Sequence, residues 1–290
     1  MTASSMPIPR RDLLSAASLL RQGESARTEL LRLTDEELAV LTAETDGGPT
    51  VWAPWSEEHA DHLESALPSV RRILLARNNL VPEGYAAPLE DREVEGDPAR
   101  LVPEPRLAGI LLLRRSAEQV TVVERSVSIE ETFHRSRRYY YHQSPGIALE
   151  EYVNPEGVHS FAVLPVPAIG PLLAELIDPH GVAHTDGEES LLPLAADGSF
   201  PVGEHLLDDT RVFTRATASG PGGRLLATVN LHATSDSFHM SEPVLDDDGQ
   251  PEALRTAELS SQGLLETLML LVSSDDDFAA SAHPGSDGKG

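Results

Sequence analysis

The chain of 290 residues holds 47 acidic and 22 basic residues and has a formal net charge of −25 at pH 7. A field of this sign repels nucleic acid and anionic membrane surfaces, which excludes both as the main partner and favours a protein partner that is neutral or basic. The chain has no cysteine, which excludes disulfides, thiol chemistry and cysteine metal sites.

Residues 1–33 predict an amphipathic helix and a lead-in. Arg10 and Arg11 stand before the apolar run LLSAASLL, as in a twin-arginine signal. The run stops at Arg21 and no small-residue cleavage site follows, so a helix is the better interpretation. Its apolar residues fall on one helical face: Leu13, Leu14, Ala17 and Leu20. No apolar run in the chain reaches the length of a bilayer span, so we expect a cytoplasmic protein.

Residues 34–177 predict a first half that begins with helices. Thr34 and Glu37 have the spacing of a capping box, which predicts that a helix begins here. The segment TVWAPW, residues 50–55, predicts a short strand interrupted by its proline.

A long helical stretch follows, capped by Ser56 and divided or kinked at Pro68. Residues 82–105 are rich in proline, glycine and charge, which is typical of a linker or a long surface loop. The apolar run Leu107 to Leu113 then predicts a buried strand that leads into the following sheet.

The order of elements in the remainder of the chain occurs twice. Residues 120–177 predict four strands and a closing apolar helix, and residues 212–272 predict the same order. The first strands begin at Val120 and Val212. Two copies are too few for a solenoid. We therefore expect an α+β fold with two related antiparallel sheet-plus-helix halves, related by a pseudo-two-fold axis and preceded by N-terminal helices.

The expected organisation has five parts. They are the N-terminal helix and lead-in, the first half, a connecting loop, the second half and a disordered acidic tail: residues 1–33, 34–177, 178–209, 210–272 and 273–290.

The sequence holds no G-x-S-x-G elbow, P-loop, G-x-G-x-x-G or H-E-x-x-H motif. The run GPGG, residues 220–223, predicts a turn, because no helix follows it to hold a phosphate. His59 and His62 lie among acidic residues on a predicted helix, where a solvated charged face is the simpler interpretation. The acidic run Asp246 to Gly249 predicts a hairpin turn and not a calcium loop. We expect no catalytic residue and no cofactor.

One metal alternative stays open. His180 and His184 lie in the loop DPHGVAHTD with two aspartates, and such a loop can hold a metal ion. A metal there would favour a metal-dependent enzyme.

Arginines and tyrosines are adjacent in the run RSRRYYY, residues 135–141, as in a platform for single-stranded nucleic acid. Alternation along a strand places Tyr139 and Tyr141 on one face and Tyr140 on the other, so only part of the set can stack on one ligand. We expect the tyrosines in the core and the arginines paired with Glu150 and Glu151 across the sheet.

The opening of the first half resembles the EspG family, the cytosolic chaperones of ESX (type VII) secretion in actinobacteria. The matching runs are LTDEELAVL, VWAPW and SVRRILLARNNLV. The family shows an L-T-x-x-E start and an R-x-x-L-x-x-R-G-L helix end, and residues 72–80 correspond to the latter with asparagines in place of the glycine. The family also has two related sheet-and-helix halves, so the resemblance extends from about Leu33 to Val272. The tyrosine-rich strand and the HGVAH loop are not family features.

The resemblance implies a chaperone that holds a helical secretion substrate in the cytosol and covers its aggregation-prone tip. The predicted partner-binding surface is the link 128–137, where Ile129 and Phe133 are apolar residues in a polar loop. The alternative is that Phe133 folds back onto the sheet. A regulatory or immunity-type protein with another partner stays open as a second class.

Overall fold

The computed structural model describes residues 8–43, 51–86, 100–129, 132–144, 146–193, 209–245 and 251–272. Contacts divide the chain into two compact units. Unit 1 comprises Met1–Ala117 and Tyr141–Pro165, and unit 2 comprises Glu118–Tyr140 and Val166–Gly290. The described residues form an α+β protein with eight α-helices, a ten-stranded sheet and a two-stranded sheet. The predicted acidic tail and the turn at 246–249 lie outside these residues.

The large sheet has the strand order β1-β7-β6-β5-β4-β9-β10-β11-β12-β8. Its strands are β1 (Thr28–Thr34), β4 (Gln119–Ile129), β5 (Thr132–Gln143), β6 (Ile147–Val153), β7 (Val158–Pro165), β8 (Ser190–Pro193), β9 (Val212–Ser219), β10 (Leu225–Ala233), β11 (Phe238–Leu245) and β12 (Pro251–Glu258). The pairs with a described register run antiparallel. The two predicted sets of four strands are confirmed as β4–β7 and β9–β12. The first strands of the two sets, β4 and β9, pair with each other from Val120↔Ser219 to Val127↔Val212.

The two edge strands, β1 and β8, were not predicted. β1 lies in what the sequence indicated to be a lead-in, and β8 lies in the predicted connecting loop. The pairing of β1 with β7 shifts register between Glu29 and Leu31. The carbonyl of Leu30, at this bulge, accepts a hydrogen bond from Arg106 Nη2 at 2.7 Å. β8 has four residues and ends at Pro193.

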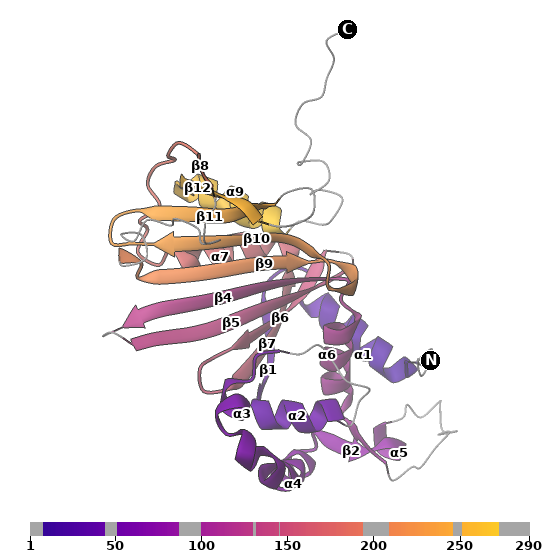
Figure 1. Ribbon diagram of the computed structural model, residues 1–290. Helices are drawn as coiled ribbons and strands as arrows, with labels where there is room; N and C mark the ends of the chain where they lie inside the picture. The colour runs from indigo at the N-terminus through magenta and orange to yellow at the C-terminus, as the bar shows by residue number, and fades with distance from the viewer. Residues whose placement is uncertain are drawn as a thin grey trace. The chain divides into compact units, whose positions relative to one another are not determined.

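In unit 1, α1 (Arg10–Gln22) lies beside α6 (Pro105–Ser116), as Figure 1 shows. The helices approach closely at Gly109, where a Cβ atom would lie 3.0 Å from the backbone of Ser15. The buried face of α1 carries Ala16 and Leu19. The predicted apolar face was therefore wrong: Leu13 is 50% and Leu14 is 56% exposed. The fit of small residues against Gly109 decides which side of α1 packs.

The predicted strand at Leu107–Leu113 is wrong, since these residues lie in α6. The carboxylate of Glu104 accepts hydrogen bonds from the backbone nitrogens of Arg106 and Leu107, each at 2.9 Å, and Pro105 occupies the first turn. These are start signals of a helix. Burial on all sides removes the helical period from the sequence, which is why the run is ambiguous between strand and helix.

The capping box at the start of α2 (Asp35–Ala43) is confirmed. The backbone nitrogen of Thr34 donates to Glu37 Oε2 at 3.1 Å, and the nitrogen of Glu37 donates to Thr34 Oγ1 at 3.3 Å. This reciprocal pair satisfies two backbone donors that the helix leaves open.

The predicted strand at 50–55 is wrong, because Pro54 begins the short helix α3 (Pro54–Glu58) and Ser56 lies inside it. α3 ends at Glu58, and His59 separates it from the next helix. The ring of His59 stacks on Trp55 with centroids 4.6 Å apart. α4 (Ala60–Ala76) then runs through Pro68 without a division. A proline removes one hydrogen bond of a helix, and the rest of this helix holds.

α4 ends at Ala76, and Asn78, two residues later, adopts a left-handed conformation with φ of 57°. Asparagine is one of the few non-glycine residues that adopt this region at small cost. The predicted loop at 82–105 is corrected in part. β2 (Leu80–Pro82) pairs with β3 (Leu101–Pro103), and α5 (Glu83–Ala86) follows β2. Residues 87–99 lie outside the described part.

In unit 2, α7 (Ile169–Ile177) and α9 (Ser261–Val272) contact each other and β9, behind the strands in Figure 1. Gly170 of α7 faces Met269 of α9, because a Cβ on Gly170 would lie 2.7 Å from Met269 Sδ. Both closing helices are confirmed. Across the described residues, no helix combines the length and the apolar character needed to cross a membrane.

Candidate functional site

The predicted partner-binding residues lie at the end of a long hairpin and not in a polar loop. β4 continues to Ile129 and β5 resumes at Thr132, so the expected link at 128–137 is strand, apart from Glu130 and Glu131, which are not described. The sequence predicted a loop here because most side chains in residues 128–137 are polar. Isoleucine, threonine and phenylalanine in this stretch nevertheless favour extended backbone.

Phe133 is 73% exposed and Ile129 is 53% exposed. The alternative that Phe133 folds back onto the sheet is therefore wrong. Glu124 contacts both Arg135 and Arg137, which places the three on one face of the hairpin. Alternation places Phe133 on this face and Ile129 on the other. The structure thus does not bring the two predicted residues together.

The tyrosines of the same strand are buried, as expected: Tyr139, Tyr140 and Tyr141 are at most 6% exposed. For two of the arginines, the expected pairing with Glu150 and Glu151 is wrong. Arg135 and Arg137 pair with Glu124. Glu150 pairs with Arg27 Nε at 2.7 Å and Glu151 with Arg114 Nε at 2.9 Å.

A buried cluster of charged side chains in unit 1 was missed. His159, on β7, has its Nδ1 at 2.7 Å from Glu151 Oε1 and its Nε2 at 2.6 Å from Asp35 Oδ1. An ionised carboxylate can only accept, so this arrangement favours the imidazolium form, in which both ring nitrogens donate. Burial alone would lower the pKa of His159, but the hydrogen bonds with Asp35 and then with Glu151 outweigh it and raise the pKa.

Glu151 is the centre of the cluster. Its second oxygen accepts from Arg114 Nε at 2.9 Å and from the Tyr141 hydroxyl at 2.8 Å. Burial would raise the pKa of Glu151, but Arg114, followed by His159 and Tyr141, lowers it below the usual range. Burial, with the neighbouring carboxylate, raises the pKa of Tyr141 well above 10.0. Two cations thus balance two carboxylates.

This cluster supports the fold and is closed to a substrate. The side chains of His159, Glu151 and Asp35 are 0% exposed. The second oxygen of Asp35 accepts from the backbone nitrogen of Ser56 at 3.0 Å, which ties the cluster to α3. The arrangement joins α2 and α3 to β6 and β7. One sequence signal could have found it: charged residues at Glu150, Glu151 and His159 interrupt strands that are otherwise apolar.

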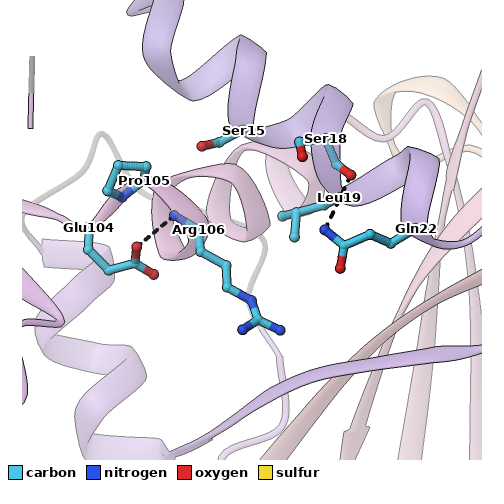
Figure 2. Close-up of a pocket in the computed structure, with 7 residues that line it drawn as sticks. All are labelled: Ser15, Ser18, Leu19, Gln22, Glu104, Pro105 and Arg106. Carbon is cyan, nitrogen blue, oxygen red and sulfur yellow. Dashed lines mark hydrogen bonds between the residues drawn. The ribbon is translucent and has the colours of Figure 1, made fainter. Parts of the chain in front are cut away.

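A cavity of about 380 Å³ lies between α1 and the start of α6. Figure 2 shows its polar lining, including Glu104, Arg106 and Gln22. These groups already serve the fold. Glu104 caps α6, Arg106 holds the carbonyl of Leu30, and the Gln22 amide donates to the Ser18 carbonyl at 3.3 Å. Three of its polar side chains are therefore engaged within the fold, and the rest of its polar side chains are the serines Ser15 and Ser18.

His180 and His184 are exposed in a turn that Asp178 organises by accepting from the nitrogens of Val182 and Ala183. The described ranges hold no group of three or more histidine and carboxylate side chains that could bind a metal ion. The two histidines thus have no third ligand within those ranges.

Comparison with known proteins assigns no family. No protein-family profile matches the chain, and no curated protein matches it. Three solved structures give distant likenesses. A trans-AT polyketide synthase dehydratase domain from Brevibacillus brevis is 10% identical with a TM-score of 0.18, over 50% of this chain and 78% of that one.

An acyl-ACP thioesterase from Bacteroides thetaiotaomicron is 10% identical with a TM-score of 0.18, over 80% of this chain and 97% of that one. HtdX of Mycobacterium tuberculosis is 13% identical with a TM-score of 0.17, over 80% and 98%. Likenesses this distant assign neither a fold family nor an activity.

Proposed function

We propose that this chain is a non-enzymatic protein-binding protein, a cytosolic chaperone for a helical substrate of type VII secretion. The observation that carries the proposal is Phe133, which is 73% exposed near the end of the β4–β5 hairpin. A phenylalanine ring removed from water contributes about 1.5–3 kcal/mol. An aromatic anchor on a hairpin offers this free energy to a partner.

The strand order supports the proposal through the relation between the two sets of four strands. From the pair β4 and β9, each set of four strands runs outward in chain order, and a helix, α7 or α9, follows each set. We interpret these sets as the two halves of a pseudo-two-fold sheet. This arrangement accords with the resemblance to the EspG family.

The opening of the first half supports the same resemblance. Thr34 and Glu37 form the capping box of the L-T-x-x-E pattern. Asn78, in place of the family's glycine, has a positive φ. Asparagine therefore adopts the backbone conformation that explains a glycine at this position. The net charge of −25 also suits a protein that must stay soluble while it holds an aggregation-prone substrate.

The test is purification of the tagged chain from its own host, with identification of bound proteins by mass spectrometry. We expect small helical secretion substrates in stoichiometric amount. The Phe133→Asp variant should lose them and keep its unfolding free energy within about 0.5 kcal/mol of the parent. Tyr85→Asp is the matched control, because Tyr85 is an aromatic residue of unit 1 that is 86% exposed, and it should retain the substrates.

Three results would contradict the proposal. The chain could purify alone at several salt concentrations, Phe133→Asp could retain the substrates, or that variant could lose several kcal/mol of stability, which is the signature of a packed residue. Stoichiometric recovery of a non-secretory protein would support instead a regulatory or immunity-type binding protein.

A further inference from the structure

One face of the hairpin and of the neighbouring strand β9 in unit 2 combines arginines with phenylalanines. Glu124 of β4 is paired across the sheet with Arg215 of β9, and Ser126 is paired with Phe213. On β5, Phe133 alternates with two arginines on the side that Glu124 contacts. We name this the basic–aromatic face and define it by six residues: Glu124, Phe133, Arg135, Arg137, Phe213 and Arg215.

The opposite side of the same strands has a different character. Val123 and Ala216, which are paired neighbours on that side, are at most 1% exposed, and α7 and α9 contact β9. On the basic–aromatic face, Arg135 and Arg215 are exposed, and Arg137 keeps about a quarter of its side chain in contact with water. One side is core, and the other is accessible to a partner.

This face carries three guanidinium groups and one carboxylate, and two of the three contact that carboxylate. Glu124 Oε2 is 2.6 Å from Arg137 Nη2, and its Oε1 is 3.5 Å from Arg135 Nε. Arg215 donates instead to Asn230 Oδ1 at 3.1 Å and lies over the ring of Phe213, 6.0 Å from its centroid. Within the described ranges, Arg215 makes no ion pair. The face is locally cationic in a chain of strongly negative charge.

The histidine that contacts Phe213 does not alter this balance. His232 lies beside Phe213, with ring centroids 5.1 Å apart. Burial, with a smaller effect of His239, lowers the pKa of His232 to about 4. His232 is therefore neutral at pH 7, and the positive charge of the face comes from arginine alone.

The spacing of these groups matches the surface of a helix. Residues i and i+2 of a strand lie about 6.6 Å apart on one face, which is the separation of Arg135 from Arg137 along β5. Carboxylates at positions i and i+4 of a helix are neighbours at about 5–6 Å between Cβ atoms. Phe133 and Phe213 offer apolar contacts beside the arginines. An amphipathic helix with paired acidic residues next to leucines has the complementary pattern.

We propose that the basic–aromatic face binds an acidic amphipathic helix of the protein partner, with the arginines on its carboxylates and the phenylalanines on its apolar side chains. This inference rests on the proposed function, since it names the chemistry of the segment that Phe133 anchors. The net charge of −25 favours a partner that is neutral or basic as a whole, but it does not prevent the binding of one acidic segment. Physiological salt screens exposed charges beyond about 8 Å, so the arginines dominate at contact distance.

The experiment uses the full chain and two labelled synthetic helical peptides. The peptides share the same leucines and differ only in carrying Glu pairs or Gln pairs at i and i+4 beside them. Fluorescence anisotropy measures the dissociation constants. At about 0.05 M salt, the Glu peptide should bind at least about tenfold more tightly than the Gln peptide, and about 0.5 M salt should remove most of this advantage.

Variants assign the advantage to the face. The double variant Arg135→Gln with Arg215→Gln should remove the preference for Glu and keep the melting temperature of the parent. Arg10→Gln with Arg21→Gln is the matched control, because these arginines belong to α1, and it should keep the preference. Phe133→Ala should weaken both peptides.

Equal binding of the two peptides, no binding of either, or a Glu preference that survives in the Arg135→Gln and Arg215→Gln variant would overturn the inference. So would an oligothymidylate that binds through the same arginines while the Glu peptide does not, since the face would then bind phosphodiesters. The two proposals can fail separately. Native substrates lost in Phe133→Asp together with equal peptide binding would leave the proposed function standing. An arginine-dependent Glu preference without native helical substrates would leave the face standing.

Discussion

Glu151 in unit 1 and Glu124 in unit 2 both pair with arginine, but the first stabilises the fold and the second lies on the proposed binding face. Glu151 is fully buried, and each of its oxygens has a partner. Glu124 is about one quarter exposed and is shared by two arginines. Removing one partner from a buried pair leaves an uncompensated charge in a medium that solvates it poorly. Near the surface, water solvates a charge that loses its partner, so a glutamate there can take part in binding at little cost to stability.

The largest expected effect is the loss of the buried cluster. Glu151→Gln should lower the unfolding free energy by about 3–5 kcal/mol, because Arg114 and the imidazolium of His159 then lack their shared carboxylate. Urea denaturation measures this loss. A loss under about 1 kcal/mol would mean that water reaches the cluster, and the comparison between the two glutamates would then break.

A pH effect of intermediate size should come from His159. Its pKa is raised above 6.5, so its contribution is fully present below about pH 6.5 and is lost as pH rises through the folded pKa. Thermal melting from pH 6 to 9 should show a decline in the parent. His159→Gln should be less stable at pH 6 and lack the part of the decline that this residue causes. Parallel curves for parent and variant would show that the ring is neutral in the fold.

The pKa of His142 is shifted in the opposite direction to that of His159, so the two histidines affect stability in different pH ranges. Burial lowers the pKa of His142 to about 4. This histidine, together with His232, reduces stability only as pH falls below about 6.5, where the unfolded chain takes up protons and the folded chain does not. The alkaline decline is thus free of both.

The smallest effect on stability is expected at the exposed glutamate. Glu124→Gln should change the unfolding free energy by less than about 1 kcal/mol. The same change removes the carboxylate that pairs with Arg135 and Arg137, so it should tighten the Glu peptide a few-fold and leave the Gln peptide unchanged. Weaker binding of the Glu peptide would mean that Glu124 positions Arg135 and Arg137 for the partner.

The strands and closing helices of the two repeated sets could be predicted because their alternation and turns are local signals. The turn at GPGG is an example, with Gly222 and Gly223 both at positive φ. Burial on all sides hid the helical period of α6. The polar side chains of the hairpin ends concealed their strand character, although Ile129 and Phe133 favour extended backbone.

The buried cluster could not be predicted from local patterns, because its members are distant in the chain. Asp35 and His159 are 124 residues apart, and Arg114 and Glu151 are 37 apart. The cationic character of the basic–aromatic face depends on register in the same way. Only the pairing of β4 with β9 places Arg215 opposite Glu124.

The two edge strands have a consequence for self-association. A free sheet edge is a template for another chain, and proteins protect it with bulges, short strands and proline. At β1, the bulge beside Leu30 and the guanidinium of Arg106 interrupt the row of backbone groups. At β8, four residues ending in Pro193 leave little to pair with. Each end of the sheet therefore resists strand addition, and the chain is protected from edge-to-edge aggregation. Its own proposed task is to keep another protein from aggregating.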